Sequence, residues 1–121
     1  MNLIMAAILI GNLQVTSYRS VPNQTDDSPN YTSIGEHVNN HGVAVSRDLL
    51  KRGGGPLNYG DLVYIEGFGF KFVNDCMGAQ NKQAVDIWVG SYKEEKKIGV
   101  KHGKVWLIVP TLREEKTNEA R

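Results

Sequence analysis

Stretches in which apolar and polar residues alternate, rich in Val, Ile, Phe and Trp, predict a series of short β-strands. Gly-bearing turns separate these stretches, which cover residues 14–18, 42–46, 61–65, 68–73, 84–89 and 104–109. Residues 47–52 suit a single helical turn closed by the glycines that follow, and residues 93–98 suit a brief helix. The pattern predicts an all-β fold, a closed or nearly closed β domain with small helical turns.

The two ends of the chain differ from this pattern. Residues 1–12 are mostly apolar but have about half the length that crosses a bilayer, so we expect no transmembrane span. No Lys or Arg precedes Arg19, so the segment is either a degenerate export signal or an extra strand. Residues 13–110 are expected to form one barrel domain, and residues 111–121 a charged tail.

Composition narrows the functional classes. The chain has 121 residues, 13 glycines and a formal net charge of +1, with acidic and basic residues interspersed. No basic stripe suits a phosphate backbone, so we expect no nucleic-acid partner. Gly53 to Gly55 lack the Lys-Ser/Thr ending of a phosphate-binding loop, and no cofactor is expected.

The segment Ala84 to Val89 carries the most informative candidate residue. Strand alternation places Val85 and Ile87 on the core face and Asp86 with Trp88 on the other. A carboxyl group against an aromatic or apolar wall has the raised pKa of a proton donor in glycan cleavage. The indole of Trp88 would stack on a sugar ring, and its alternative role is core packing.

Other chemistry finds weaker support. Asp75 follows a β-run and reads on pattern alone as a turn former. Cys76 with a histidine would make a nucleophile and base, but no spacing supports the pair. His37 and His41 have the spacing of a helical metal pair, yet the Asn39-Asn40 and Gly42 around them favour a loop, so no metal site is expected.

The order of several short motifs resembles the three-aspartate (3D) domain, especially its small bacteroidetes and bacteriophage members. The motifs are Tyr18-Arg19-Ser20-Val21-Pro22-Asn23-Gln24-Thr25-Asp26, Thr32-Ser33-Ile34-Gly35, Val43-Ala44-Val45-Ser46-Arg47-Asp48-Leu49-Leu50, Tyr59 through Gly69, and Asn74-Asp75-Cys76-Met77 through Val85-Asp86-Ile87. The resemblance spans about Val15 to Val109.

The resemblance implies a six-stranded double-psi β-barrel related to the barrel of the membrane-bound lytic transglycosylase A. Asp86 then matches the catalytic acid, eleven positions after Asp75, which matches the turn aspartate. Asp26 resembles the loop aspartate of the small 3D proteins. Trp88, Thr32 and Tyr18 are the residues expected to contact the glycan.

Two motifs depart from the family pattern. Ser46-Arg47 replaces Asp-Pro, with Asp48 nearby, and Cys76-Met77-Gly78 replaces a Thr-Gly-Gly turn. The second change removes a glycine that lets sugar approach the backbone closely.

Together these patterns predict a peptidoglycan lytic transglycosylase, whose partners are glycan strands and other virion or cell-envelope proteins. Its location would be the envelope, periplasm or exterior of a bacterium, or the virion or host periplasm for a phage. The alternatives are a noncatalytic wall-binding or virion module with the same barrel, and a plain hydrolase.

Overall fold

The computed structural model describes residues 2–20, 31–35 and 37–113, and in these ranges the chain is mostly β-structure. The strands are β1 (Asn2–Tyr18), β2 (Gly42–Val45), β3 (Leu62–Ile65), β4 (Gly69–Cys76), β5 (Ala84–Trp88) and β6 (Lys101–Arg113). One α-helix, α1 (Tyr92–Ile98), precedes β6. The all-β prediction is therefore confirmed.

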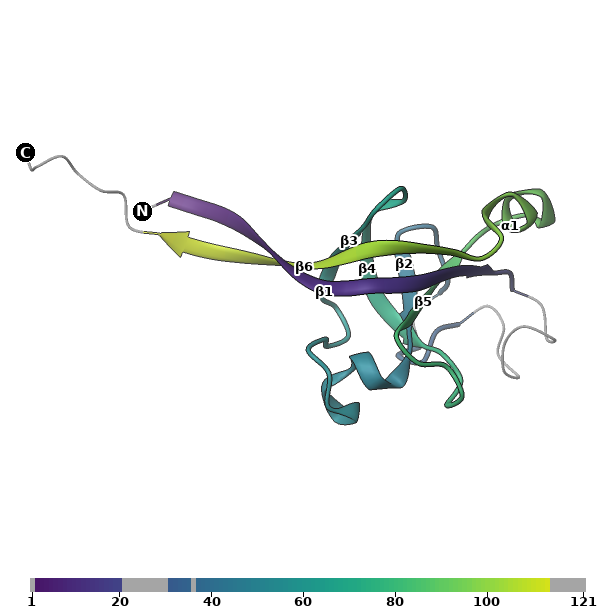
Figure 1. Ribbon diagram of the computed structural model, residues 1–121, viewed down its shortest axis with the longest axis horizontal. Coiled ribbons are helices and arrows are strands. Elements are labelled where there is room, and N and C mark those ends of the chain that lie inside the picture. The colour runs from purple at the N-terminus through teal and green to yellow at the C-terminus, as the bar shows by residue number, and fades with distance from the viewer. Residues whose placement is uncertain (1, 21–30, 36, 114–121) are drawn as a thin grey trace, which may run out of the picture.

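The strands close into a barrel in the order β1-β5-β2-β4-β3-β6 (Figure 1). β1 pairs with β5, and β2 with β4, in parallel; the other neighbours are antiparallel. Every strand sends at least one fully buried valine into the interior, a residue type that suits a pleated surface. These are Val15, Val43, Val45, Val63, Val73, Val85 and Val105.

β1 and β6 are much longer than the alternating stretches indicated. They pair from Asn2 opposite Arg113 to Val15 opposite Lys101, with a bulge between Leu9 and Gly11. Residues 2–12 are thus continuous with the part of β1 that enters the barrel. Beyond the barrel the two strands continue as a two-stranded arm (Figure 1).

A second feature of these strands is the side that faces away from the core. Four in-register rows cross the β1–β6 pair, and two of them continue over β3 and β4. We name their outward side the outer apolar face; its members are Leu3, Met5, Ala7, Leu9, Leu62, Tyr64, Phe70, Phe72, Trp106, Ile108, Pro110 and Leu112.

The short helical segments fit their sequence signals. Arg47–Leu49 and Lys51–Gly53 form two 3₁₀ turns, where one turn was predicted, because Leu50 between them is extended. Gly54, with φ of 92°, ends the second turn in the left-handed conformation that glycine adopts most readily. Ser91 caps α1 by accepting a hydrogen bond from the Glu94 backbone.

None of the helices in the described part of the chain has the length and apolar character that crossing a bilayer requires.

Candidate functional site

The site is a transverse row of side chains over four neighbouring strands. Thr16 of β1 lies opposite Asp86 of β5, Asp86 opposite Ala44 of β2, and Ala44 opposite Asp75 of β4. In-register neighbours share one side of a sheet, and the small Ala44 leaves the space between the two carboxylates free of a large side chain. We name this set the acid row.

The predicted alternation in β5 is confirmed. Val85 and Ile87 are buried in the core, while Asp86 and Trp88 are only partly buried and lie on the other side of the strand. The barrel therefore holds a carboxyl group at a place where water reaches it poorly.

Burial, together with the negative charges of Glu95 and Asp75, raises the pKa of Asp86 to about 6. A hydrogen bond from Thr16 Oγ1 to Asp86 Oδ1, 2.8 Å long, acts in the opposite direction because it stabilises the carboxylate. The result is a carboxyl group that exchanges its proton near neutral pH, which suits a general acid and base.

Asp75 lies inside β4, so its reading as a turn former from the pattern is wrong; the strand continues through Cys76. Its Oδ1 accepts hydrogen bonds from the backbone nitrogens of Ser33 and Cys76, both 2.9 Å long, and from the Ser33 hydroxyl. These bonds fix the carboxylate at the edge of the acid row.

Tyr18 of β1 contacts Asp75. Its hydroxyl donates a long hydrogen bond of 3.5 Å to Asp75 Oδ2. Burial, followed by the charges of Asp75 and Asp86, raises the pKa of Tyr18 well above its ordinary range, so the phenol stays neutral. Since only 6% of Tyr18 is exposed, it positions Asp75 more than it offers a surface for a ligand.

Trp88 lies opposite Tyr18 in the β1–β5 pair. Its Nε1 donates a 2.8 Å hydrogen bond to Ser20 Oγ, which fixes the indole beside the acid row. The ring is partly buried, a position that allows both packing and contact with a ligand.

The remaining predicted residues are Thr32 and Asp26. Thr32 is buried next to Ser33, which holds Asp75. Asp26 lies outside the described residues.

Three residues of the site were missed by the sequence reasoning. Thr16 contacts Asp86, Ser33 contacts Asp75, and Glu95 of α1 acts on Asp86 by its charge while forming a 3.0 Å ion pair with Arg19. Alternation within β1 places Thr16 and Tyr18 on one side, but only the parallel β1–β5 pairing brings Thr16 to Asp86.

Cys76 has a polar environment without histidine among its recorded partners. Burial acts to raise the pKa of its thiol, but hydrogen bonds with Ser33 and Tyr59 and the positive charge of Arg52 bring it below its ordinary value. The Arg52 guanidinium lies 3.5 Å from the sulfur.

His37 packs edge-on against Tyr31, with ring centroids 5.5 Å apart. Within the described residues no group of three or more His, Cys, Asp or Glu side chains is arranged to hold a metal ion.

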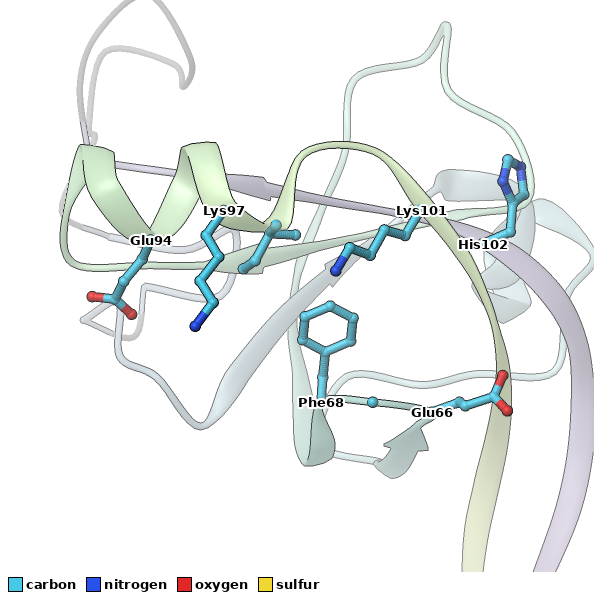
Figure 2. Close-up of a pocket in the computed structure, with 8 residues that line it drawn as sticks. Glu66, Phe68, Glu94, Lys97, Lys101 and His102 are labelled. Atoms are coloured by element: carbon cyan, nitrogen blue, oxygen red, sulfur yellow. The ribbon is translucent and has the colours of Figure 1, made fainter.

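A separate pocket of about 510 Å³ lies between α1, the start of β6 and the β3–β4 turn (Figure 2). Figure 2 shows the Phe68 ring pointing from that turn toward the Lys101 side. Its lining contains both signs of charge and none of the acid row: Glu66, Gly67, Phe68, Glu94, Lys97, Ile98, Lys101 and His102.

Neither the protein-family models nor the curated proteins match this sequence. Among solved structures, Streptomyces papain inhibitor resembles the chain, with a TM-score of 0.52 and 19% sequence identity. The alignment covers 82% of this chain and 93% of that chain. At this identity the likeness concerns the fold alone.

Proposed function

We propose that the protein is a peptidoglycan lytic transglycosylase of the three-aspartate domain type, with Asp86 as its single acid and base. The observation that carries the proposal is the pKa of about 6 that burial gives Asp86, beside a second carboxylate in the acid row. The resemblance of the motifs around Asp75 and Asp86 to that family supports the choice of substrate.

The finer description of the barrel belongs to the same proposal. A double-psi barrel contains six strands with parallel pairs set between antiparallel ones. The parallel pairs β1–β5 and β2–β4 in the closed barrel support this assignment. The parallel β2–β4 pair places Asp75 beside Ala44, and the antiparallel β2–β5 pair places Asp86 on its other side.

The proposed reaction needs one carboxyl group because the substrate supplies the nucleophile. Protonated Asp86 gives its proton to the glycosidic oxygen between N-acetylmuramic acid and N-acetylglucosamine, and the bond from that oxygen to C1 breaks. The Asp86 carboxylate then takes the proton of the muramic acid C6 hydroxyl as its oxygen bonds to C1. The products are a 1,6-anhydro end and a free hydroxyl, and Asp86 is protonated again.

Asp75 would hold sugar hydroxyls or orient Asp86, since Ser33, Cys76 and Tyr18 fix its position. Trp88 would provide the stacking surface beside the acid.

The rival is a noncatalytic wall-binding module with the same barrel. Its support is that Asp75 already accepts hydrogen bonds on both oxygens and that Met77 stands where the family turn has glycine. The structural neighbour bears the name of an inhibitor, and a fold by itself does not imply catalysis.

The test is incubation of the purified protein with peptidoglycan sacculi, followed by mass analysis of the released muropeptides. Anhydro ends support the proposal, reducing ends indicate hydrolysis, and retention on sacculi without release indicates a binding module.

Asp86→Asn should lower turnover by at least about a hundredfold with the fold intact. Asp61→Asn, in the turn before β3, is the matched control and should keep full activity. Asp86→Asn activity within about threefold of the unaltered protein would contradict the assignment.

Asp86 must be protonated before the first step, so kcat/KM should fall as pH rises above about 6.

A further inference from the structure

The outer apolar face contradicts the usual pattern of a sheet with one side in water. In such strands polar side chains alternate with the apolar ones that enter the core. The opposite side of the same strands already supplies core residues, including Val63, Val105 and the partly buried Leu107. β1, β3 and β6 therefore carry apolar side chains on both sides over these rows, as strands covered on both sides do.

The exposure of this face is large. Leu3, Leu112, Met5, Leu9, Phe70 and Phe72 each expose between 51% and 67% of their surface. These six side chains alone present on the order of 700 Å², above the largest patch usual for a monomer and close to the roughly 800 Å² that one partner contributes to a stable interface.

The arm gives a second reason to expect that another surface packs against the outer apolar face. An isolated two-stranded ribbon is marginally stable in water, because neither side of it is buried. At its outer end the arm has Leu3 opposite Leu112 and Met5 opposite Pro110, with no neighbouring strand among the described residues. A stable arm requires a surface against one of its sides.

The face continues from the arm onto an aromatic end. Trp106, Tyr64 and Phe70 lie side by side in one row across β6, β3 and β4. The ring centroids of Tyr64 and Phe70 are 4.9 Å apart, and those of Tyr64 and Trp106 are 5.9 Å apart. Aromatic residues are enriched in the cores of protein interfaces.

The charges at the border favour a second copy of the chain over a bilayer. Beyond the aromatic end the next positions are Glu66 and Lys104, which have opposite signs, and Glu66 accepts a 3.0 Å hydrogen bond from the Lys104 backbone. A surface that binds anionic lipid would have a basic border. An uncharged face with a mixed border meets its own copy without like-charge repulsion.

We propose that the outer apolar face is the interface of a homodimer, in which the arm of each copy covers the aromatic end of the other. A two-fold axis through the middle of the face brings the arm end of one copy over Tyr64 and Phe70 of its partner, and the reverse contact follows by symmetry. The acid row shares β1 and β4 with the outer apolar face, but its residues on these strands, Thr16 and Asp75, lie near the strands' ends and outside the face, so each copy keeps its own site.

Sedimentation velocity of the full chain over a range of concentrations tests this proposal. The expected mass is twice 13.4 kDa. Met5→Lys on the arm and Phe70→Lys on the aromatic end should each weaken self-association by at least about tenfold, since each places an unpaired charge in the interface. Both side chains are more than half exposed, so each variant should keep the circular dichroism spectrum of the barrel.

Val100→Lys is the control, because Val100 is 65% exposed and lies outside this face. It should leave the mass unchanged. A monomer at every concentration, or a dimer that both lysine variants leave intact, would overturn the proposal. So would binding of the monomer to phosphatidylcholine vesicles through the same residues, which would identify lipid as the cover.

Discussion

The acid row and the outer apolar face occupy different parts of one sheet, and each departs from the usual pattern of a sheet surface in water. The acid row places carboxylates where water is scarce and gives each of them hydrogen bonds. The outer apolar face places large apolar side chains where water is plentiful and gives them no polar function. The comparison suggests that the first surface is arranged for chemistry and the second for contact.

The largest expected effect on stability comes from the free-energy penalty of ionising Asp86 in the folded protein. The pKa of Asp86 is about 6 in the folded protein and 3.8 in its ordinary state, so the folded state binds the proton more tightly. Ionised Asp86 therefore destabilises the fold. The penalty is absent below about pH 4, grows as pH rises, and is complete above about pH 6, where it reaches at most about 3 kcal/mol.

Asp86→Asn removes this penalty while keeping an oxygen for Thr16. Urea unfolding at pH 8 should show a variant more stable than the unaltered protein by about 1 to 3 kcal/mol, and the gain should disappear at pH 3.5. Equal stability of the two proteins at pH 8 would mean that Asp86 is better solvated than the acid row indicates.

A smaller effect is expected at Trp88, which lies on the same side of β5 as Asp86. Trp88→Ala should admit water to the carboxyl group, lower its pKa and move the fall of kcat/KM to lower pH; it should also weaken retention on sacculi. Trp88→Phe should preserve much of both, because a ring still excludes water.

Thermal melts separate this role from packing. A fully buried Trp costs about 3 to 5 kcal/mol when truncated, and the partly buried Trp88 should cost less. A large loss of stability with unaltered sacculus binding per folded molecule would remove Trp88 from the site.

The smallest expected effect is at Cys76, next to Asp75 in β4. Its low pKa reflects Ser33, Tyr59 and Arg52, and the proposed reaction uses no thiol. Cys76→Ser should change turnover by less than about threefold in the sacculus assay. Complete loss of activity in a folded variant would restore the cysteine as a nucleophile and remove the acid row from its proposed role.

Several features of the barrel were predictable because they depend on local periodicity. Alternation in β5 places Asp86 and Trp88 on one side and Val85 in the core, and the glycines mark the turns. Which strands pair with each other could not be predicted from the local pattern, because parallel neighbours are joined by long connections. For that reason the contacts of Thr16 and Ser33 with the two carboxylates were not predicted, and Asp75 was interpreted as part of a turn.

The length of β1 and β6 was also missed. The alternating pattern begins only at Gln14 in the first strand and stops at Val109 in the last. The strands extend to Asn2 and Arg113 because each supplies the other with backbone hydrogen bonds. The uninterrupted apolar sequence at residues 3–10 fits either a signal or a strand, and the β6 residues that pair with it lie far along the chain.

The pairing of β1 with β6 has a consequence for how the chain folds. The first strand of the barrel finds its antiparallel partner in the last, so barrel closure requires contacts between residues far apart in the sequence. Such contacts slow folding, because loop-closure entropy is lost before the contacts contribute favourable free energy. During synthesis, β1 leaves the ribosome as an uncharged segment, and almost the whole domain must be synthesised before β6 can pair with it. That interval exposes it to aggregation and makes a chaperone useful to this chain.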